Sequence, residues 1–360
     1  MDSLVSWYSS DPFMKDVFVS CFFPKFGKLI DVKSGFCGDI LVFDQGENCI
    51  PRFVCVKIPK RTEQRQNAID DFKEEIKFQM KMWYSPFVVM PFDVGWANEV
   101  PYACYRFWNG SLEDLLKNET IPEMEMLSLL FYIAKGLEHC HSKGMVAHQD
   151  LKPGNIFIRD FAKSHRLGPD SHPIYKLAML ADFGTANGFE KGSFNGAKPY
   201  SSPEQILKQP LSNASDVFSL GIIAYEIITK GNHPIGIKIS DWWPSPKVGH
   251  SKRYIGEKHW KKWAEDKCPI KESLDKSKLV ENCIVNMLEF EANNRPPLSF
   301  FIECLQKRMK EINKNAYDNM MLFSNWISNL STKESLEKAH PYLNERLHIF
   351  VEDMEKVNKG

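Results

Sequence analysis

Apolar residues recur along the chain with two periods, and the change of period separates candidate strands from candidate helices. Period two, bounded by glycine, proline and charged residues, predicts five short strands at residues 28–32, 41–43, 52–57, 87–90 and 102–105. Between the third and fourth strands, residues 68–82 follow a helical period that places Phe72, Ile76 and Met80 on one side. This order predicts a small antiparallel sheet of five strands with one helix.

The helical period dominates the rest of the chain. Residues 122–142 form a long amphipathic pattern, and an apolar helix is expected from Asp216 through Ile228. Two apolar β runs, one directly after Asn155 and one at residues 174–180, lie between these helices. The fold class is therefore α+β, with a sheet lobe and a larger, mainly helical lobe. A length of 360 residues also favours two lobes, because it exceeds the size at which a single core stops growing.

Charge and cysteine content narrow the class of protein. The 46 Lys and Arg residues balance 46 Asp and Glu residues, so no global field attracts nucleic acid or an anionic membrane. The nine cysteines are never closer than six positions, which excludes CxxC spacing and predicts reduced thiols. The start Met1-Asp2-Ser3 lacks a secretory signal, and no apolar segment approaches the roughly 18 residues of a membrane span. We therefore expect a cytoplasmic protein.

The stretch at residues 148–158 carries the candidate chemistry. Asp150 is placed to accept a proton from an attacking hydroxyl, Lys152 could steady a transferring phosphoryl group, and Asn155 could hold a metal ion. With the β run and the Asp182-Phe183-Gly184 that follow, this spacing resembles the catalytic loop and metal-binding motif of the eukaryotic-type (Hanks-type) serine/threonine protein kinase family. The sequence Asp-Leu-Lys-Pro at residues 150–153 resembles the one that the serine/threonine branch of this family carries at this place, and not that of the tyrosine branch.

This resemblance implies a bilobal kinase fold and a reaction. ATP and Mg²⁺ would be used to transfer a γ-phosphate to serine or threonine hydroxyls of a protein substrate, with autophosphorylation included. Asp150 would orient or deprotonate the hydroxyl, and Asn155 and Asp182 would hold Mg²⁺. Lys152 would complete the electrostatic cradle around the phosphoryl group.

The resemblance also assigns residues of the smaller lobe to the nucleotide. The strand at residues 52–57 ends in Lys57, which would contact the α- and β-phosphates. Glu75 stands where the family carries the carboxylate that pairs with this lysine. Glu74 is the neighbouring alternative, because a shift of one residue in the helix would exchange the two.

Two further segments are candidates for the ATP site. Gly35 and Gly38 match the second and third glycines of the kinase phosphate loop, whereas Lys33 stands in place of the first. A simple hairpin with glycine in its turn is the alternative interpretation. Cys104 and Tyr105 lead into the segment that resembles the hinge, whose backbone would meet the adenine edge, with Cys104 at the back of the pocket.

The chain departs from the family at two further positions, both after the glycine-rich segment. Gln149 stands where the family commonly has an arginine before the catalytic aspartate, so the resemblance implies a kinase of the non-RD type, in which control by activation-loop phosphorylation is not expected. Ala197 stands where a threonine is common. Two structural expectations follow the family pattern: Arg295 pairs with Glu204, and Asp216 ties down the catalytic-loop backbone.

Three histidines near the loop are expected to be structural. His139 and His141 are two positions apart in a helix, so they face different sides and do not suit a zinc site. We interpret both as packing residues and His148 as a brace for the loop.

Other function classes remain open. A pseudokinase scaffold is suggested by the glycine-rich loop that lacks its first glycine, by Gln149 and by Ala197. Failure to bind Mg-ATP would favour this alternative. A small-molecule kinase shares the fold, but Asp182-Phe183-Gly184 and Ser202-Pro203-Glu204 favour a protein substrate. Assembly through the tail and the tryptophan-rich insert is a third possibility.

The domain organisation follows from these anchors. We expect an N-terminal strap at 1–27, a small lobe at 28–105, a large lobe at 106–305 with insertions at 159–173 and 235–269, and a C-terminal helical extension at 306–360. The insert at 235–269 interleaves tryptophans with lysines, which suits an irregular packed subdomain or a docking site for a partner; we do not expect nucleic acid there. An apolar stripe from Leu343 to Met354 predicts that the extension packs on the large lobe or on another chain.

Overall fold

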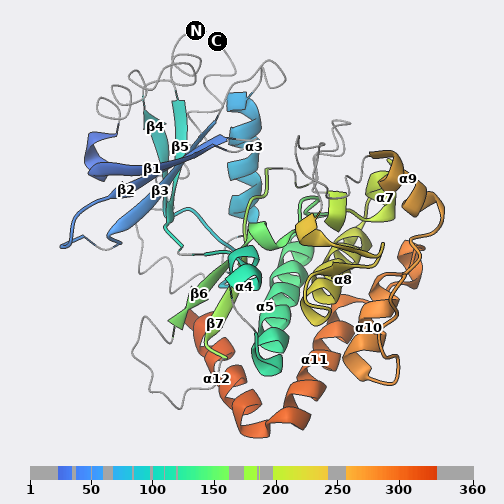
Figure 1. Cartoon of the computed structure of the whole chain (residues 1–360). Coiled ribbons are helices and arrows are strands. Elements are labelled where there is room, and N and C mark those ends of the chain that lie inside the picture. The colour runs from blue at the N-terminus through green and yellow to red at the C-terminus, as the bar shows by residue number, and fades with distance from the viewer. Residues whose placement is uncertain are drawn as a thin grey trace. The chain divides into compact units, whose positions relative to one another are not determined.

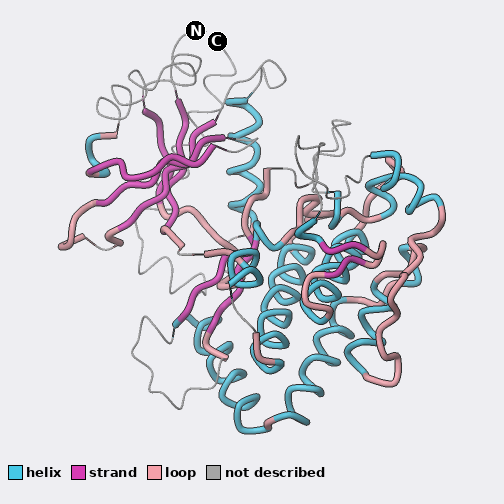
Figure 2. Tube along the Cα trace, in the orientation of Figure 1, coloured by secondary structure: helices cyan, strands magenta, loops and turns pink. Residues whose placement is uncertain are grey.

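The computed structural model describes twelve stretches of the chain, which fall into two compact units. These stretches are residues 23–34, 38–49, 51–59, 68–82, 85–97, 100–108, 110–118, 121–161, 174–184, 186, 198–241 and 257–330. The first unit draws on Met1–Tyr84, Val89–Trp108 and Asn329–Gly360, and the second on Ser85–Val88 and Asn109–Ser328. Figure 1 labels the elements of both units, and Figure 2 separates their helices from their strands.

The first unit is built on one antiparallel sheet with the strand order β1-β2-β3-β5-β4. Its strands are β1 (Lys28–Ser34), β2 (Gly38–Asp44), β3 (Phe53–Pro59), β4 (Asp93–Ala97) and β5 (Val100–Arg106). One long helix, α3 (Ala68–Lys81), accompanies the sheet (Figure 1). The expected five-stranded sheet is therefore confirmed, and α3 is its one α-helix among the residues of this unit that the structure describes.

Each face of this sheet packs against a hydrophobic cluster of its own. Successive residues of a strand point to opposite faces, so neighbours in sequence belong to different clusters. On β5, Tyr102 and Cys104 join a hydrophobic cluster that includes Phe23 and Phe26 of the preceding segment. Ala103 lies between them in sequence and belongs to a second cluster with α3. The described end of the expected strap, residues 23–27, thus packs on the sheet, with the Phe23 and Tyr102 rings edge to face at 5.5 Å. Residues 1–22 lie outside the described part of the chain.

The fourth strand is not where the sequence placed it. Residues 87–90 form no strand: Phe87 and Val88 belong to the second unit, where Val88 makes one isolated bridge with Leu180 and the Phe87 carbonyl accepts a hydrogen bond from the Leu180 amide at 2.8 Å. The prediction was wrong because a short apolar run has no period that separates a strand from other buried backbone. Pro91 follows, and the true strand β4 begins at Asp93.

The second unit is mainly helical, with a long helix, α5 (Glu123–Ser142), packed against α8 (Asn213–Ile228), α11 (Leu298–Ile312) and strand β7. Helix α8 is buried over nearly its whole length, and its Gly221 lies so close to α10 (Leu279–Met287) that an added Cβ would be 3.1 Å from the Met287 Cβ. Ser212 caps α8 through a capping box with Ser215.

Shorter elements complete this unit. The hairpin of β6 (Ile156–Asp160) and β7 (Lys176–Leu180) follows the short 3-10 helix η2 (Pro153–Asn155). The others are α4 (Leu112–Asn118), η4 (Lys198–Tyr200), α7 (Pro203–Ile206), β8 (Asn232–His233), β9 (Ile237–Lys238), η5 (Ile239–Asp241), α9 (Glu257–Glu265) and η6 (Ala292–Asn294). The hairpin and η2 frame the loop that carries Asp150.

The expected C-terminal extension at 306–360 is described as far as residue 330, where it comprises the end of α11, which continues through Ile312, and helix α12 (Lys314–Leu330). Its Tyr317 and Met320 are buried, and Phe323 meets the rings of Phe161 and Tyr175 edge to face at 5.1 and 5.3 Å. This helix therefore packs beside the residues that follow β6 and precede β7, at the connected end of the hairpin. The stripe from Leu343 to Met354 lies outside the described residues. Among the described helices, none is both long enough and apolar enough to cross a membrane.

Candidate active site

Asp150 is the centre of a hydrogen-bonded cluster in the loop before β6. Its Oδ2 accepts from Lys152 Nζ at 2.6 Å and from Asn155 Nδ2 at 2.9 Å, and Asn155 Nδ2 also reaches the Asp150 carbonyl at 2.8 Å. The structure therefore brings these three predicted residues together. The amide nitrogen of Asn155 makes both bonds, so its oxygen, the atom that binds metals, makes none within the described chain.

The loop keeps this shape because a buried carboxylate at the start of α8 holds its backbone. Asp216 accepts from the His148 amide at 2.9 and 3.0 Å, as the sequence predicted. His141 Nε2 lies 2.8 Å from the same carboxylate, so this histidine has a structural role, as expected, but through a bond to Asp216 that the sequence did not predict. Asp216 also lies in the first turn of α8, where the helix dipole favours negative charge.

Asp182 is positioned by bonds from this loop to the residue before it. The Ala181 amide donates to the Asn155 carbonyl at 2.9 Å, and His148 Nε2 donates to the Ala181 carbonyl at 3.1 Å. The His148 ring also packs on Phe183, with ring centres 5.0 Å apart. His148 is thus a brace, as predicted, and it places Asp182 directly beside the catalytic loop.

Two residues of this site adopt backbone angles that only glycine adopts freely. Gln149, which precedes Asp150, has φ of 68°, and Asp182, itself a predicted site residue, has φ of 62°. Such conformations cost on the order of 1–3 kcal/mol and persist where the surroundings fix them. The Gln149 backbone carbonyl accepts a hydrogen bond from Gln205 Nε2 at 2.9 Å. The buried side-chain nitrogen Nε2 of Gln149 has no hydrogen-bond partner among the described residues.

A buried ion pair anchors the segment that begins α7. Arg295 donates to both oxygens of Glu204, at 2.7 and 2.9 Å, and to the backbone carbonyls of Ala214, Glu289 and Phe290. Burial alone would raise the pKa of Glu204, but the bonds and charge of Arg295 outweigh burial and hold the pKa below its ordinary value. The predicted pairing of these two residues is confirmed.

In the first unit, Lys57 and Glu75 form a buried pair. Lys57 Nζ lies 2.5 Å from Glu75 Oε1, and the two side chains are only 11% and 5% exposed. Glu74 instead faces solvent and pairs with Lys77 at 3.1 Å. The register with Glu75 on the lysine is therefore the correct one, and a buried lysine needs such a carboxylate to remain charged.

The candidate adenine and glycine residues are brought together only in part. Tyr105 lies on the face of the sheet that packs against α3, and its hydroxyl donates to Gln79 Oε1 at 2.8 Å. Cys104 is fully buried in the cluster on the opposite face. Ala103, which is opposite Lys57 in the strand register, is therefore on the Tyr105 side and not on the Cys104 side. Gly38 begins β2, and an added Cβ there would overlap the Ile58 carbonyl, so packing alone requires glycine. Gly35 lies outside the described residues.

The oxygen donors of the second unit suit a hard divalent cation. Within the described residues, no group of three or more His, Cys, Asp or Glu side chains could hold a metal by itself. The carboxylate of Asp182 and the amide oxygen of Asn155 are hard donors of the kind that such an ion prefers. Magnesium ions are commonly bound by one or two carboxylates together with water and substrate phosphates, so this donor set fits Mg²⁺.

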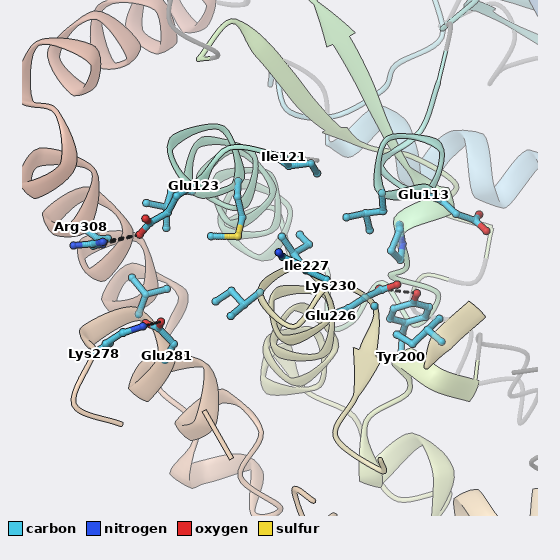
Figure 3. A pocket seen from close by; sticks show the side chains of 18 of the residues that line it. Glu113, Ile121, Glu123, Tyr200, Glu226, Ile227, Lys230, Lys278, Glu281 and Arg308 are labelled. Carbon is cyan, nitrogen blue, oxygen red and sulfur yellow. Dashed lines mark hydrogen bonds and ion pairs between the residues drawn. The ribbon is translucent and has the colours of Figure 1, made fainter. Parts of the chain in front are cut away.

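Sequence reasoning missed a buried carboxyl at the end of α8. Glu226 accepts a hydrogen bond from the Tyr200 hydroxyl at 2.9 Å (Figure 3). Burial raises the pKa of Glu226 to about 7 and outweighs the hydrogen bond from Tyr200, which lowers it, while the nearby charge of Glu113 adds a smaller raising effect. The signal in the sequence was a single acidic residue within an otherwise apolar helix.

A second missed residue is His233, which connects the 3-10 helix η4, which ends at Tyr200, with α9. Its Nε2 donates to the Pro199 carbonyl at 2.7 Å, and its ring packs between Trp260 and Trp263 at 5.2 Å from each. Burial lowers the pKa of His233 to about 3, so the ring is neutral. These two tryptophans of the insert are buried, as the packing interpretation expected; Trp242 and Trp243 lie outside the described residues.

Comparison with known proteins agrees with this geometry. A family model described as the protein kinase domain matches residues 41–316, which is well over half of the chain. The chain belongs to the protein kinase domain family, and the expected α+β kinase fold is confirmed.

Curated relatives carry kinase names. A probable serine/threonine-protein kinase of Clostridium perfringens is 28% identical over 202 residues, which cover 52% of this chain and 27% of that protein. The serine/threonine-protein kinase pkn2 of Myxococcus xanthus is 29% identical over 216 residues, covering 57% and 24%. Mitogen-activated protein kinase kinase 1 of Arabidopsis thaliana is 31% identical over 151 residues, covering 40% and 39%. The chain thus aligns with well under half the length of each of these relatives.

Proposed function

We propose that this chain transfers the γ-phosphate of ATP to serine or threonine hydroxyls of protein substrates. The single observation that carries the proposal is the cluster in which Lys152 and Asn155 both bond Asp150 while the same loop holds the residue before Asp182. These bonds support the proposal because they hold the proposed acid–base carboxylate, a cation and one proposed metal ligand together. The names of the curated relatives support the choice of serine and threonine.

Each side chain has a task in this reaction. Asp150 orients the attacking hydroxyl and accepts its proton on a carboxylate oxygen. Lys152, now bonded to that carboxylate at 2.6 Å, is near enough to stabilise charge on the transferring group. Lys57 binds the α- and β-phosphates, with Glu75 holding it extended. Asp182 and Asn155 would hold Mg²⁺, which neutralises charge on the phosphates when it is bound.

Gly38, Cys104 and Tyr105 remain proposed nucleotide contacts. Tyr105 is the better supported of the two β5 residues, because it shares the α3 face with the Lys57–Glu75 pair. Cys104 has the weaker support because its side chain fills the opposite cluster.

The test is a transfer assay with labelled ATP and Mg²⁺, with mass spectrometry to identify the residues that gain phosphate. We expect phosphoserine and phosphothreonine, and we expect Asp150→Ala to lower the rate at least about 100-fold, since that is the low end for losing a positioned acid–base group. Phosphorylation of a small metabolite without any protein product would favour the small-molecule kinase. Failure to bind Mg-ATP would favour the pseudokinase.

Gln149 leads to a proposal about regulation. A neutral amide offers no charged anchor for a phosphate on the activation segment, so phosphorylation there should contribute little to catalysis. We expect Thr185→Ala and Ser193→Ala to keep activity within about threefold of the parent, a change below about 1 kcal/mol. Inactivity after phosphatase treatment, reversed by rephosphorylation, would show that another basic residue binds such a phosphate.

We also propose lobe boundaries and a compartment. A small lobe at 28–105 and a large lobe at 106–305 are supported by the change of compact unit after Trp108. A cytoplasmic location is supported by the seven described cysteines, all of which are free thiols. Docking of a partner at the remaining part of the 235–269 insert or at the C-terminal helices stays a prediction.

A further inference from the structure

The second unit contains a large pocket that begins at the catalytic loop. Its lining runs from Lys152 and Gly154 past Tyr200 to the end of α8 and on to α10 and α11, and its volume is about 1830 Å³. In Figure 3 the Tyr200–Glu226 pair lies on one side of the pocket, and Arg308–Glu123 and Lys278–Glu281 lie on the other. Sites for small ligands usually measure roughly 300–1,000 Å³, so this pocket is large enough for a peptide segment.

The charges on the pocket wall do not cancel. Eight of the lining residues are cations and five are glutamates. Each glutamate already has a partner: Glu123 and Glu311 bond Arg308, Glu281 bonds Lys278, Glu113 bonds Lys117, and Glu226 accepts from Tyr200. On the cationic side, Lys230, Lys238, Lys276 and Lys307 are exposed and make no ion pair with the described residues. The uncompensated charge of the pocket is therefore positive and is carried by lysine.

Part of the remaining lining is apolar. The half-buried side chains of Met126 of α5, Ile228 of α8 and Leu279 of α10 contribute apolar surface between the lysines. Tyr200 is the single aromatic residue among the described lining, and its hydroxyl is bonded to Glu226. Single-stranded nucleic acid is bound through several stacking aromatics, so this wall does not suit it. An extended peptide with acidic and aliphatic side chains matches both the lysines and the apolar surface.

The kind of cation decides between two acidic partners. Phosphate groups are recognised most specifically by the planar fork of arginine, and the one arginine in the pocket is held by Glu123 and Glu311. The four lysines with no acidic partner are separate point charges on flexible stems, which suit carboxylates spread along a chain. The geometry points to a docking groove for an aspartate- and glutamate-rich segment of the protein substrate. This inference rests on the proposed kinase function, because the groove opens at the catalytic loop.

Binding should be measured without turnover, so that the groove and the reaction are tested separately. Fluorescence anisotropy would follow a labelled peptide of glutamates and leucines around one serine, bound to the full chain carrying Asp182→Asn. A glutamine-for-glutamate peptide and a lysine-for-glutamate peptide are the controls. We expect the acidic peptide to bind at least about tenfold more tightly than the neutral one, which is about 1.4 kcal/mol, and to weaken as salt is raised.

A matched pair of fourfold variants locates the site. Neutralising Lys230, Lys238, Lys276 and Lys307 to glutamine should weaken acidic-peptide binding at least about tenfold, because several exposed pairs of small individual strength are lost together. The control neutralises four exposed lysines outside the pocket, namely Lys143, Lys258, Lys262 and Lys314, and should leave binding within about twofold. All eight side chains are exposed, so both variants should keep the parent melting temperature.

Several outcomes would overturn the groove. These are equal binding of acidic and neutral peptides, equal loss in the two fourfold variants, competition by a single-stranded oligonucleotide as strong as by the acidic peptide, and binding of a phosphoserine peptide only. If the acidic peptide binds as expected but no variant of the chain transfers phosphate, the groove stands and the proposed function fails. If phosphate transfer occurs without any preference for acidic peptides, the proposed function stands and the groove fails.

Discussion

The Lys57–Glu75 pair can be tested one side chain at a time. Both side chains are nearly buried, so removal of either leaves the other charge uncompensated. We expect Lys57→Met to lower phosphate transfer by about 100- to 1,000-fold, as the loss of one positioned electrostatic donor does. Glu75→Gln should cause a smaller loss, because the amide can still accept a hydrogen bond from the lysine.

Glu74 supplies the matched control for this prediction. It is exposed and bonds Lys77, so Glu74→Gln should change the initial rate less than about twofold. Initial rates at saturating ATP and the affinity for Mg-ATP should be measured for all three variants. A larger loss in Glu74→Gln than in Glu75→Gln would show that the pair serves packing and not the nucleotide.

Glu226 makes stability depend on pH near neutrality. Its folded pKa of about 7 lies above the ordinary value of 4.5. A raised carboxyl pKa favours the folded state below the unfolded pKa, and this contribution is lost as the pH rises through the folded pKa. Tyr200 and Glu113 are the titratable groups that act on it.

As the pH rises from about 5 to about 8, we therefore expect the free energy of unfolding of the parent to decrease. This decrease should exceed that of Glu226→Gln by on the order of 2 kcal/mol. The amide keeps an acceptor for the Tyr200 hydroxyl and cannot ionise. Urea unfolding at several pH values measures both proteins. Parallel pH profiles would contradict the raised pKa.

At the scale of elements, the sequence predicts well where a pattern is local and long. Helices α3, α5 and α8 follow sustained periodicity, and Asp150, Asn155 and Lys57 stand in short motifs with fixed spacing. Strand β4 was missed because its Asp-Val-Gly-Trp-Ala sequence lacks the alternation of apolar residues. Its Gly95 lies against the Tyr102 ring, a contact that depends on the neighbouring strand.

Site residues that depend on long-range contacts could not be predicted from the sequence. His141 meets Asp216 across 75 positions, and His233 meets Pro199 across 34. No period or motif marks such pairs before the fold is known. The face of β5 that carries Cys104 was likewise fixed by strand register, which a motif does not determine.

Helix α12 should contribute to the stability of the second unit. Phe323 makes edge-to-face contacts with Phe161 and Tyr175, so Phe323→Ala should lower the free energy of unfolding by about 1–3 kcal/mol. The adjacent Leu322 is 67% exposed, and Leu322→Ala should stay within about 0.5 kcal/mol of the parent. Thermal unfolding of both variants measures the difference. Equal effects of the two substitutions would show that α12 does not pack there in solution.

At the scale of the whole molecule, the two compact units carry different parts of the proposed chemistry. The first unit holds the Lys57–Glu75 pair on its sheet and α3. The second holds the loop of Asp150 and Asn155, the residue before Asp182, and the lysine-lined pocket. The proposed function uses residues of both units, so a variant that keeps the fold of both but removes one proposed metal ligand should abolish phosphate transfer.

Asp182→Asn is that variant, and the rate of labelled phosphate incorporation into protein hydroxyls is the decisive measurement. The amide keeps the shape of the carboxylate but loses the charge that would hold Mg²⁺. We predict incorporation at least about 100-fold below the parent across a range of Mg²⁺ concentrations, with an unchanged melting temperature in the absence of nucleotide. Near-normal incorporation by Asp182→Asn would contradict the assignment of the metal site and of the kinase reaction built on it.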